Sequence, residues 1–170
     1  VQMTKQVTGI DPQSLIQFAA AAYQDLGMPF DDALLAADSL VQADLWGHQS
    51  HGLLRLAWYC ARLRSGAMRA VTKTEVMVDA GAICVLEGHD GVGQVIAKQA
   101  VDESCRRAKA HGVGIVSVRN SNHFGTCMYF SRMGAAQGCI TMIMSNAGPN
   151  IAPWGGRQKK IGTNPWSIAV

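Results

Sequence analysis

Residues 50–65 form a predicted helix that is apolar on nearly every side and carries one short polar stripe. If Ser50 caps this helix, then His51, Arg55 and Tyr59 follow at intervals of four residues and share one face. A helix that is apolar almost all round is typical of a buried segment. The stripe therefore needs polar partners from elsewhere in the fold.

Two interpretations of this stripe are open. The three side chains could be satisfied by carboxylates or carbonyl groups with a purely structural role, because buried polar groups are normally hydrogen-bonded. Alternatively, the imidazole of His51, the guanidinium of Arg55 and the phenol of Tyr59 belong to a site. The alignment of a proton carrier, a fixed cation and a phenol favours a site.

The composition indicates an ordinary globular protein. The chain has 170 residues, of which 48% are hydrophobic and 16% are charged, so it can bury a real core and shows no sign of disorder. Its formal net charge is only +3, and most basic residues are scattered. We therefore expect no nucleic-acid binding.

No apolar run approaches the length of a membrane span, so we expect no membrane partner. Residues 1–5 lack the basic and then apolar pattern of a signal peptide, which predicts a cytoplasmic protein. The five cysteines are odd in number and widely spaced among apolar neighbours. That pattern favours free buried thiols over disulfides or a cysteine metal site.

Three helices joined by short turns are predicted for the N-terminal part. Asp11 is the expected N-cap of the first helix, Pro12 occupies its first position, and Gly27 ends it. The second helix begins at the pair Asp31-Asp32, and the third is the helix with the polar stripe. We predict that residues 1–70 form an N-terminal helical unit. The apolar side chains expected to be buried together are Leu15, Phe18, Leu26, Leu34, Leu56 and Leu63.

From about residue 72 the pattern changes to short strands that alternate with helices, and it predicts an α/β domain over residues 71–170. A hairpin is expected around Ala80-Gly81, followed by a long helix that ends at Gly112. On the outer face of that helix, Glu103 and Arg107 are in the order that favours an ion pair. The remaining expected elements are an interior strand over 113–118, a helix over 128–136 and an interior strand over 140–144.

The glycines in Gly88-x-x-Gly91-x-Gly93 do not match the dinucleotide-binding or P-loop fingerprints. We expect them to form a turn and the N-terminus of the long helix. If the protein binds a dinucleotide, it does so without the standard fingerprint.

A second polar cluster, residues 120–125, lies between a predicted strand and the helix after it. Ligands of α/β folds bind at such places, so His123 is a candidate site residue that should share a cleft with His51. The alternative is a capping loop in which His123 only packs. A third segment, residues 145–165, is rich in glycine and proline, and irregular connections of this length are commonly functional.

A metal site is a further alternative. His48, His51 and His123 could bind a metal for hydrolysis, but the turn from Gly47 to Gly52 disrupts the helical spacing that two such ligands need. We therefore predict no metal.

Four motifs, taken in order, resemble the malate/L-lactate dehydrogenase family, whose members lack the usual Rossmann fold. They are Gly47-x-x-Ser50-His51-Gly52-x-x-Arg55-x-x-x-Tyr59, Asn120-Ser-Asn-His123-Phe-Gly125, Pro153-Trp-Gly-Gly156 and Gly162-Thr-Asn-Pro165. The family also includes ureidoglycolate and sulfolactate dehydrogenases and diketogulonate reductase. The match covers about the first half of a member, which implies a non-Rossmann α/β fold that is incomplete at its C-terminus.

The resemblance implies an NAD- or NADP-dependent oxidoreductase that interconverts a 2-hydroxy acid and a 2-oxo acid, and that works as a homodimer. His51 and His123 are both candidates for the acid/base. Arg55 suits the substrate carboxylate, because a guanidinium can hold it with two parallel hydrogen bonds. Ser50 and Tyr59 would orient the histidine or bind the substrate oxygens. The implied cofactor-binding residues are Ser121, His123, Asn146, Gly162, Thr163, Asn164 and Pro165.

A non-catalytic alternative is also open, in which the chain is an inactive truncated fragment that retains the fold and an association surface. A cofactor titration distinguishes it from the dehydrogenase. The sequence does not choose among the family's substrates, or between NAD and NADP.

Overall fold

The computed structural model describes residues 9–170. The prediction about a signal peptide concerns residues 1–5 and so lies outside the described residues. Across the described range, no helix is both long and apolar enough to cross a membrane.

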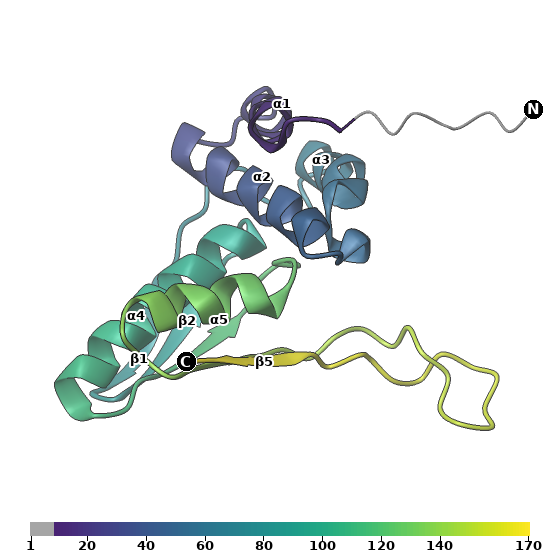
Figure 1. Cartoon of the computed structure of the whole chain (residues 1–170). Coiled ribbons are helices and arrows are strands. Elements are labelled where there is room, and N and C mark those ends of the chain that lie inside the picture. The colour runs from purple at the N-terminus through teal and green to yellow at the C-terminus, as the bar shows by residue number, and fades with distance from the viewer. Residues whose placement is uncertain (1–8) are drawn as a thin grey trace, which may run out of the picture.

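Three helices, α1 (Pro12–Gln24), α2 (Phe30–Leu45) and α3 (Leu56–Arg64), form one layer of the molecule (Figure 1). The predicted start of α1 is confirmed: the Asp11 carboxylate accepts a hydrogen bond from the Ser14 backbone N–H at 2.8 Å, and Pro12 occupies the first turn. Gly27 follows with a φ of 86°, a left-handed conformation that glycine adopts without steric penalty.

The core of this layer is built from small and aromatic side chains. Leu15, Leu26, Leu34, Leu56 and Leu63 pack against it as partly buried residues. The prediction for Phe18 was wrong, since this side chain is 66% exposed. The face of α1 that meets α2 carries Ala19, Ala20 and Tyr23, and Phe18 points away from it. The fully buried members of the core are Ala19, Ala20, Tyr23, Ala33, Ala36, Ala37, Leu40, Val41, Tyr59 and Met68.

The predicted helix over residues 50–65 is also corrected. Two 3₁₀ turns, η1 (Gln49–His51) and η2 (Leu53–Arg55), precede α3, so Ser50 is not a helix cap. Nor is the segment buried all round, because Leu54 is 77% exposed and Trp58 is 40% exposed. His51, Arg55 and Tyr59 therefore do not share one face of a continuous helix.

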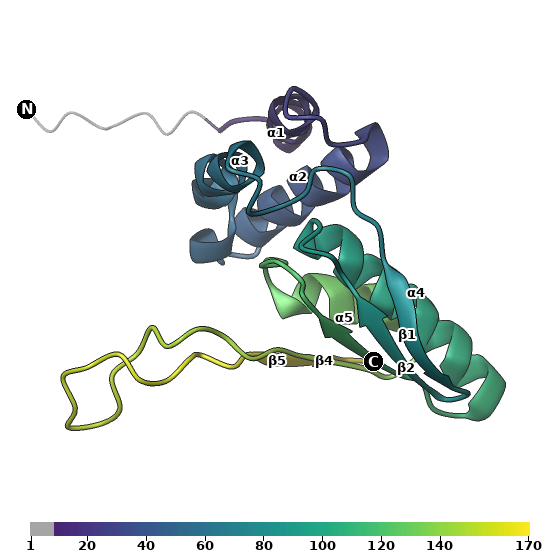
Figure 2. The ribbon, with the colours of Figure 1, turned by 180° about the vertical axis from the view of Figure 1, so that it is seen from behind.

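A mixed sheet follows. Strand β1 (Glu75–Ala80) pairs antiparallel with β2 (Ile83–Glu87), which confirms the hairpin, and β2 pairs parallel with β3 (Ile115–Arg119) (Figure 2). The chain passes from β2 to β3 through α4 (Gly93–His111), which Gly112 ends in a left-handed conformation as predicted.

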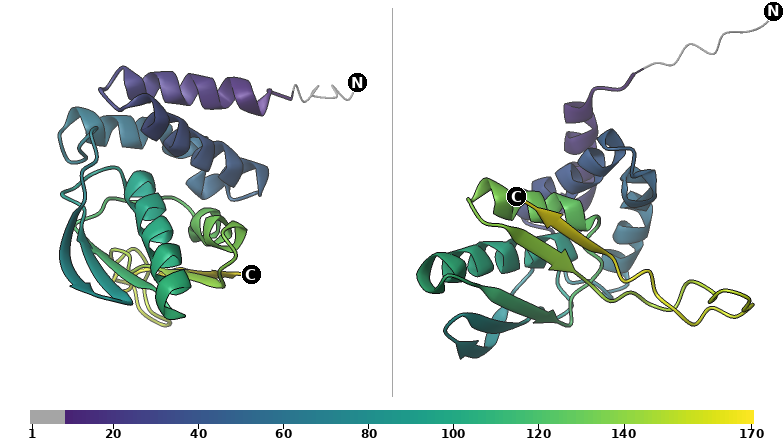
Figure 3. Two further views of the ribbon diagram at one scale, coloured as in Figure 1. Left: turned by 90° about the vertical axis from the view of Figure 1, so that its left-hand side faces the viewer. Right: turned by 60° about the horizontal axis from the view of Figure 1, so that its bottom comes forward.

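Helix α5 (Cys127–Ala136) precedes a two-stranded antiparallel sheet of β4 (Thr141–Met144) and β5 (Trp166–Ala169). Helices α4 and α5 lie between the N-terminal helices and the strands (Figure 3). The strands over 113–118 and 140–144 were expected to be buried on both faces, but Ile115 is 51% exposed and Ile140 is 81% exposed. The helices cover one face of these strands, and within residues 9–170 no layer covers the other.

Arg107 was expected on the outer face of its helix, but only 2% of its surface is exposed. Helix α4 packs along the β1–β2 hairpin, and the guanidinium reaches the Asp79 carboxylate at 2.6 Å and the carbonyl oxygen of Gly81. The predicted ion pair with Glu103 is confirmed at 2.7 Å. Hydrogen bonds from Arg106 and Arg107 lower the pKa of Glu103 to about 2.

The five cysteines are free thiols, as predicted, and four of them are buried while Cys139 is half-buried. A free cysteine in such a position packs as a small apolar side chain.

Candidate active site

His51 and His123 meet at the junction between the N-terminal helices and the sheet. Their ring centroids are 5.5 Å apart and the ring planes are inclined by 23°. His51 comes from η1, whereas His123 comes from the loop between β3 and α5. The structure thus brings together the two histidines that the sequence suggested for one cleft.

The break that places His51 depends on Asp44, at the C-terminal end of α2. Its carboxylate accepts a hydrogen bond from the Leu53 backbone N–H at 2.8 Å, which holds the two 3₁₀ turns against the helix end. Gly52 lies directly against this carboxylate, and a Cβ at this position would overlap it. The Ser-His-Gly sequence therefore contains a glycine because Asp44 occupies the space of a side chain.

Ser50 and Arg55 complete the turn around His51. The Ser50 hydroxyl lies 2.9 Å from Nδ1 of His51, and Nε of Arg55 donates to the Ser50 carbonyl oxygen at 2.7 Å. This second bond fixes the plane of the guanidinium through its Nε. The two terminal nitrogens of Arg55 make no hydrogen bond or ion pair within residues 9–170 and remain available for an anion.

Tyr59 supports His123 from behind. Its hydroxyl, in a side chain that is 1% exposed, lies 2.6 Å from Nδ1 of His123, and the Gly125 backbone N–H donates to the same nitrogen at 3.2 Å. A nitrogen that accepts a backbone N–H carries no proton of its own. The proton of neutral His123 is therefore on Nε2.

The electrostatic surroundings keep both imidazoles neutral. Burial, aided by His51, Arg55 and Arg62, lowers the pKa of His123 to about 4. Burial, aided by Arg55 and His48, also lowers the pKa of His51 below its usual 6.5. Burial raises the pKa of Tyr59, so its phenol stays protonated. At neutral pH the site holds two uncharged imidazoles, a phenol and a free guanidinium.

Asn122 is a supporting residue to which sequence reasoning gave no role. Its side-chain oxygen accepts from Nη2 of Arg62 at 2.5 Å, and its amide nitrogen donates to the carbonyl oxygens of Asp90 at 2.8 Å and Gly91 at 3.1 Å. Asn122 thereby fixes the loop that carries His123 to α3 and to the turn after β2. Its partners are distant in sequence, so no local pattern could have identified it.

Trp58 was also missed, because it was assigned to the apolar surface of a buried helix. Its ring packs edge-on against His123, with centroids 5.7 Å apart. The guanidinium carbons of Arg55 and Arg62 lie 5.9 Å and 5.2 Å from the ring centroid. The half-exposed indole thus forms one wall of the histidine site and contacts the guanidinium groups of Arg55 and Arg62.

Ser121 is next to the site, and its hydroxyl donates to the carbonyl oxygen of Asn122 at 3.1 Å. The other predicted cofactor residues, Asn146 and the run Gly162-Thr163-Asn164-Pro165, lie on an extended loop that projects from β4 and β5 (Figure 1). The side-chain oxygen of Asn164 accepts a hydrogen bond from the Ala147 N–H at 2.9 Å. This bond joins the segment that follows β4 to the segment that precedes β5. Within residues 9–170, no hydrogen bond joins this loop to either histidine.

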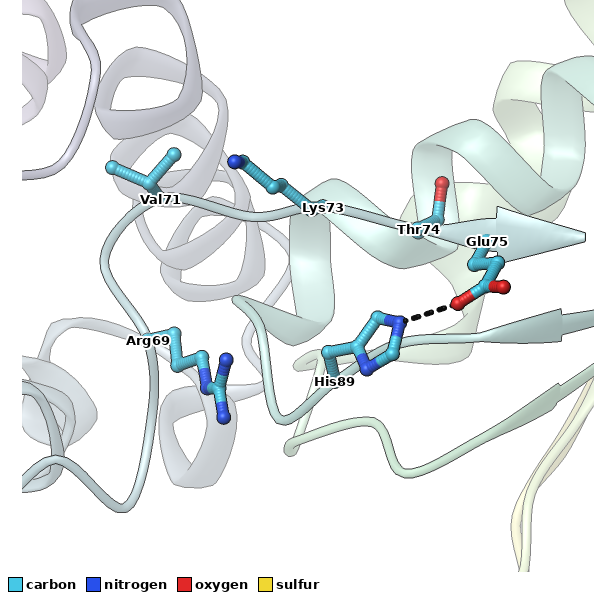
Figure 4. A pocket seen from close by; sticks show the side chains of 6 residues that line it. All are labelled: Arg69, Val71, Lys73, Thr74, Glu75 and His89. Carbon is cyan, nitrogen blue, oxygen red and sulfur yellow. Dashed lines mark hydrogen bonds and ion pairs between the residues drawn. The ribbon is translucent and has the colours of Figure 1, made fainter.

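A separate pocket of 390 Å³ lies between the start of β1 and the turn after β2 (Figure 4). Its one acid, Glu75, is already paired with His89 at 3.1 Å. None of the predicted site residues lines this pocket. Its lining consists of Arg69, Val71, Lys73, Thr74, Glu75 and His89.

In the part of the chain that the structure describes, no group of three or more His, Cys, Asp and Glu side chains is arranged to hold a metal ion. His51 and His123 stack against each other and therefore do not converge on a common point as ligands would.

The sequence model of the malate/L-lactate dehydrogenase family matches residues 10–170. The chain belongs to this family. It is 37% identical to malate dehydrogenase of Pyrococcus abyssi over 161 residues, which are 95% of this chain and 44% of that protein. It is 36% identical to L-sulfolactate dehydrogenase of Methanocaldococcus jannaschii over 160 residues, 94% of this chain and 46% of that protein.

The solved structure of malate dehydrogenase from Pyrococcus horikoshii OT3 superposes on this malate/L-lactate dehydrogenase family member with a TM-score of 0.92. Sequence identity is 34%, and the superposition covers 99% of this chain and 48% of that one. The mixed α/β fold expected from the resemblance is thus confirmed. The chain spans about half the length of the relatives that it matches.

Proposed function

We propose that this family member is an NAD(P)-dependent oxidoreductase that interconverts a 2-hydroxy acid and a 2-oxo acid. The observation that carries the proposal is the stacked pair of neutral histidines beside Arg55, a guanidinium with two free terminal nitrogens. The names of the relatives, malate dehydrogenase and L-sulfolactate dehydrogenase, support this substrate class.

Arg55 binds the substrate carboxylate. Its Nε is held by the Ser50 carbonyl oxygen, so the terminal nitrogens present a plane with fixed orientation. Two parallel hydrogen bonds to a carboxylate fix its direction as well as its position. The carbon next to the carboxylate, which bears the reacting oxygen, is thereby held close to the two imidazoles.

The two histidines take different roles in this proposal. His123 carries its proton on Nε2, so it donates a hydrogen bond to the oxygen of the 2-oxo or 2-hydroxy group and cannot accept a proton from it. A neutral imidazole whose pKa is kept low is suited to polarising a carbonyl group in this way.

His51 is then the proton carrier. When its Nδ1–H donates to the Ser50 hydroxyl, 2.9 Å away, Nε2 has a free lone pair that takes the substrate hydroxyl proton during oxidation and returns it during reduction. The Ser50 hydroxyl can either donate to Nδ1 of His51 or accept a hydrogen bond from it. Only when the hydroxyl accepts is the Nε2 nitrogen of His51 unprotonated and able to take a proton.

The dinucleotide fits the donor groups of this chain. Asn146 and Thr163 carry exposed amide and hydroxyl groups, and the amide nitrogen of Asn164 is not used by the bond that its oxygen makes with Ala147. With Ser121 they would hold the polar parts of the nicotinamide end. When bound, the dinucleotide supplies the hydride acceptor for the substrate carbon.

The test is an assay of the intact natural polypeptide for oxidation of 2-hydroxy acids with NAD⁺ and NADP⁺. His51→Gln should lower kcat by about 10²- to 10⁴-fold, the usual contribution of a positioned acid/base. His123→Gln should lower kcat less than His51→Gln does, because a glutamine amide can still donate a hydrogen bond to the substrate oxygen. His89→Gln, in the separate pocket, is the control and should keep normal kcat. Absence of turnover with every 2-hydroxy acid and both cofactors would refute the proposed function.

The enzyme works as a homodimer in this proposal. The uncovered faces of the two sheets expose large apolar side chains, and such surfaces are typical of interaction sites. The measurement is the mass of the intact protein in solution at micromolar concentration. The exposed side chains are Val76, Val78, Ile83 and Ile115 on one sheet, and Met142, Met144, Trp166 and Ile168 on the other.

A further inference from the structure

The pocket between the start of β1 and the turn after β2 has no role in the proposed mechanism, although charged side chains line most of it (Figure 4). Its volume of 390 Å³ lies within the range of small-molecule sites, about 300–1,000 Å³. Arg69 and Lys73 bring two cationic side chains to this pocket, and Glu75 is its one acid. The lining therefore has an excess of positive charge.

The two cations differ from the acid in having no partner. Within residues 9–170, the side chains of Arg69 and Lys73 make no hydrogen bond and no ion pair. Figure 4 shows the Glu75 carboxylate directed at the His89 ring, with which it is paired at 3.1 Å. Asp90 follows His89, but its side chain does not line the pocket. Both cations thus remain available for a negatively charged ligand.

Hydrogen bonds fix the two walls of the pocket to each other. The Arg69 backbone N–H donates to the carbonyl oxygen of Asp90 at 2.9 Å, and the Val92 N–H donates to the Thr72 hydroxyl oxygen at 3.0 Å. The stretch that carries both cations is therefore joined to the turn after β2 at two points. A pocket whose walls are already fixed costs less entropy when a ligand binds.

The turn after β2 has an unusual backbone. His89 and Asp90 are consecutive residues in the left-handed region, with φ of 47° and 57°. Such a conformation is unfavourable for residues other than glycine, and residues of this kind are concentrated at active sites and ligand clamps. Here the His89 N–H donates to the Glu87 carboxylate at 3.0 Å, and the Asp90 N–H donates to the Asn120 carbonyl oxygen at 2.9 Å. The turn places the His89 ring against Glu75, the acid that would otherwise repel a negatively charged ligand.

We propose that this pocket binds the phosphate group of a small organic phosphate through the guanidinium of Arg69 and the ammonium of Lys73. A guanidinium can donate two parallel hydrogen bonds to phosphate oxygens, and an ammonium adds a compact charge with three donors. Val71 offers an apolar wall to the carbon part of the ligand. The phosphate contacts assigned here are those of the two cations alone. The site is separate from the two histidines, and the inference does not depend on the proposed function.

The charge of the ligand follows from the pair of cations. A phosphate monoester carries about 1.5 to 2 negative charges near pH 7 on one compact group, which matches two neighbouring cations. A single carboxylate would leave one of them without a counter-charge. The phosphate belongs either to a free metabolite or to the bound dinucleotide, and the experiment separates these two sources.

The test is isothermal titration calorimetry of the intact natural polypeptide with glycerol 3-phosphate, in a phosphate-free buffer of constant ionic strength near neutral pH. The unmodified protein should show saturable binding. Arg69→Gln and Lys73→Gln should each weaken that binding roughly tenfold or more, because each removes a charge-assisted hydrogen bond. Without ligand, both variants should keep the melting temperature of the unmodified protein, since neither side chain has a partner to lose. Lys109→Gln removes the same charge from the exposed surface of α4 and is the matched control.

A second titration, with NAD⁺ or NADP⁺ present in excess, identifies the source of the phosphate. If the pocket holds a phosphate of the dinucleotide, the dinucleotide should abolish the binding of glycerol 3-phosphate, and Arg69→Gln should weaken the binding of the dinucleotide. If the ligand is a free metabolite, glycerol 3-phosphate should bind with unchanged affinity in the presence of either dinucleotide. Both results support a phosphate site in this pocket.

Three results would overturn the proposal. The first is the absence of saturable binding at millimolar glycerol 3-phosphate, and the second is equal affinity in the unmodified protein and both pocket variants. The third is an equal loss of affinity in Lys109→Gln, which would mean that the ligand responds only to the overall charge of the protein. Calorimetry needs no turnover, so a failure of the phosphate site is distinguishable from a failure of the proposed function.

Discussion

The hydroxyl oxygen of Tyr59 lies 2.6 Å from Nδ1 of His123, although 64 positions separate the two residues in sequence. Tyr59→Phe should lower the free energy of unfolding by about 1–2 kcal/mol, the usual effect of one lost buried hydrogen bond. It should also lower kcat, because His123 loses the partner that orients its ring.

Tyr129→Phe is the control for this change. Its half-buried phenol donates to the Asp38 carboxylate at 2.5 Å, outside the histidine site. The control should lose stability in chemical denaturation but retain kcat. Equal losses of kcat in both variants would mean that Tyr59 acts only through global stability.

The lowered pKa of His123 predicts a pH dependence of stability. The folded protein holds His123 at a pKa of about 4, whereas the unfolded value is near 6.5. Between these values the unfolded chain binds more protons, so the contribution is present above pH 6.5 and is lost as the pH falls through 4. Above pH 6.5, this contribution of His123 to the free energy of unfolding is at most about 3 kcal/mol.

His123→Gln should lack this contribution. The measurement is the difference in unfolding free energy between the unmodified protein and the variant at pH 7.5, 5.5 and 4.5, which removes the effect of other groups. The difference should shrink toward acid pH. His89→Gln, at an exposed position, is the control. A difference that does not change with pH would contradict the proposed charge state of His123.

Arg55→Lys should raise KM for 2-hydroxy acids roughly tenfold to a hundredfold. A lysine ammonium keeps the charge, but it has no Nε–H that could bond the Ser50 carbonyl oxygen while the other nitrogens stay free. Nor can it bind a carboxylate with two parallel hydrogen bonds. Arg64→Lys, on the exposed surface of α3, should leave KM unchanged. Steady-state kinetics of the intact enzyme would measure both, and an unaltered KM in Arg55→Lys would remove Arg55 from the substrate site.

Gly52→Ala should disrupt the turn that places His51. The added Cβ would overlap the Asp44 carboxylate and break its bond to the Leu53 N–H, for an expected loss of about 1–3 kcal/mol in stability. Gly9→Ala adds the same methyl group where no other atom lies within 4 Å, and it is the control. In Gly52→Ala, both the melting temperature and kcat/KM should fall. In the control variant, neither should change.

Arg107→Met should destabilise the protein by about 2–4 kcal/mol, because it removes a buried cation and leaves the carboxylates of Asp79 and Glu103 without it. Arg106→Met also breaks an ion pair with Glu103, but the Arg106 side chain is 63% exposed and such pairs contribute little. Thermal unfolding of the two variants would compare them directly, and similar losses would show that burial of Arg107 does not matter.

Features set by neighbouring residues could be predicted from the sequence. Asp11 and Pro12 determine the start of α1 through one backbone hydrogen bond and one fixed φ angle, and Gly112 ends α4 with a left-handed conformation. The β1–β2 hairpin likewise follows from its own turn. The motif around His123 was recognised as a site for a similar reason, since its polar residues are consecutive.

Features that depend on distant partners were decided only by the tertiary structure. The helix pattern from Ser50 onward is locally sound, yet Asp44 takes the Leu53 N–H and divides the segment into two 3₁₀ turns and α3. Arg107 looks like a surface residue until the hairpin covers it, and Asn122 has partners on two distant segments, α3 and the turn after β2. Local hydrogen-bonding and φ preferences are encoded within a few residues, whereas the burial of a charge or amide depends on which distant surface packs against it.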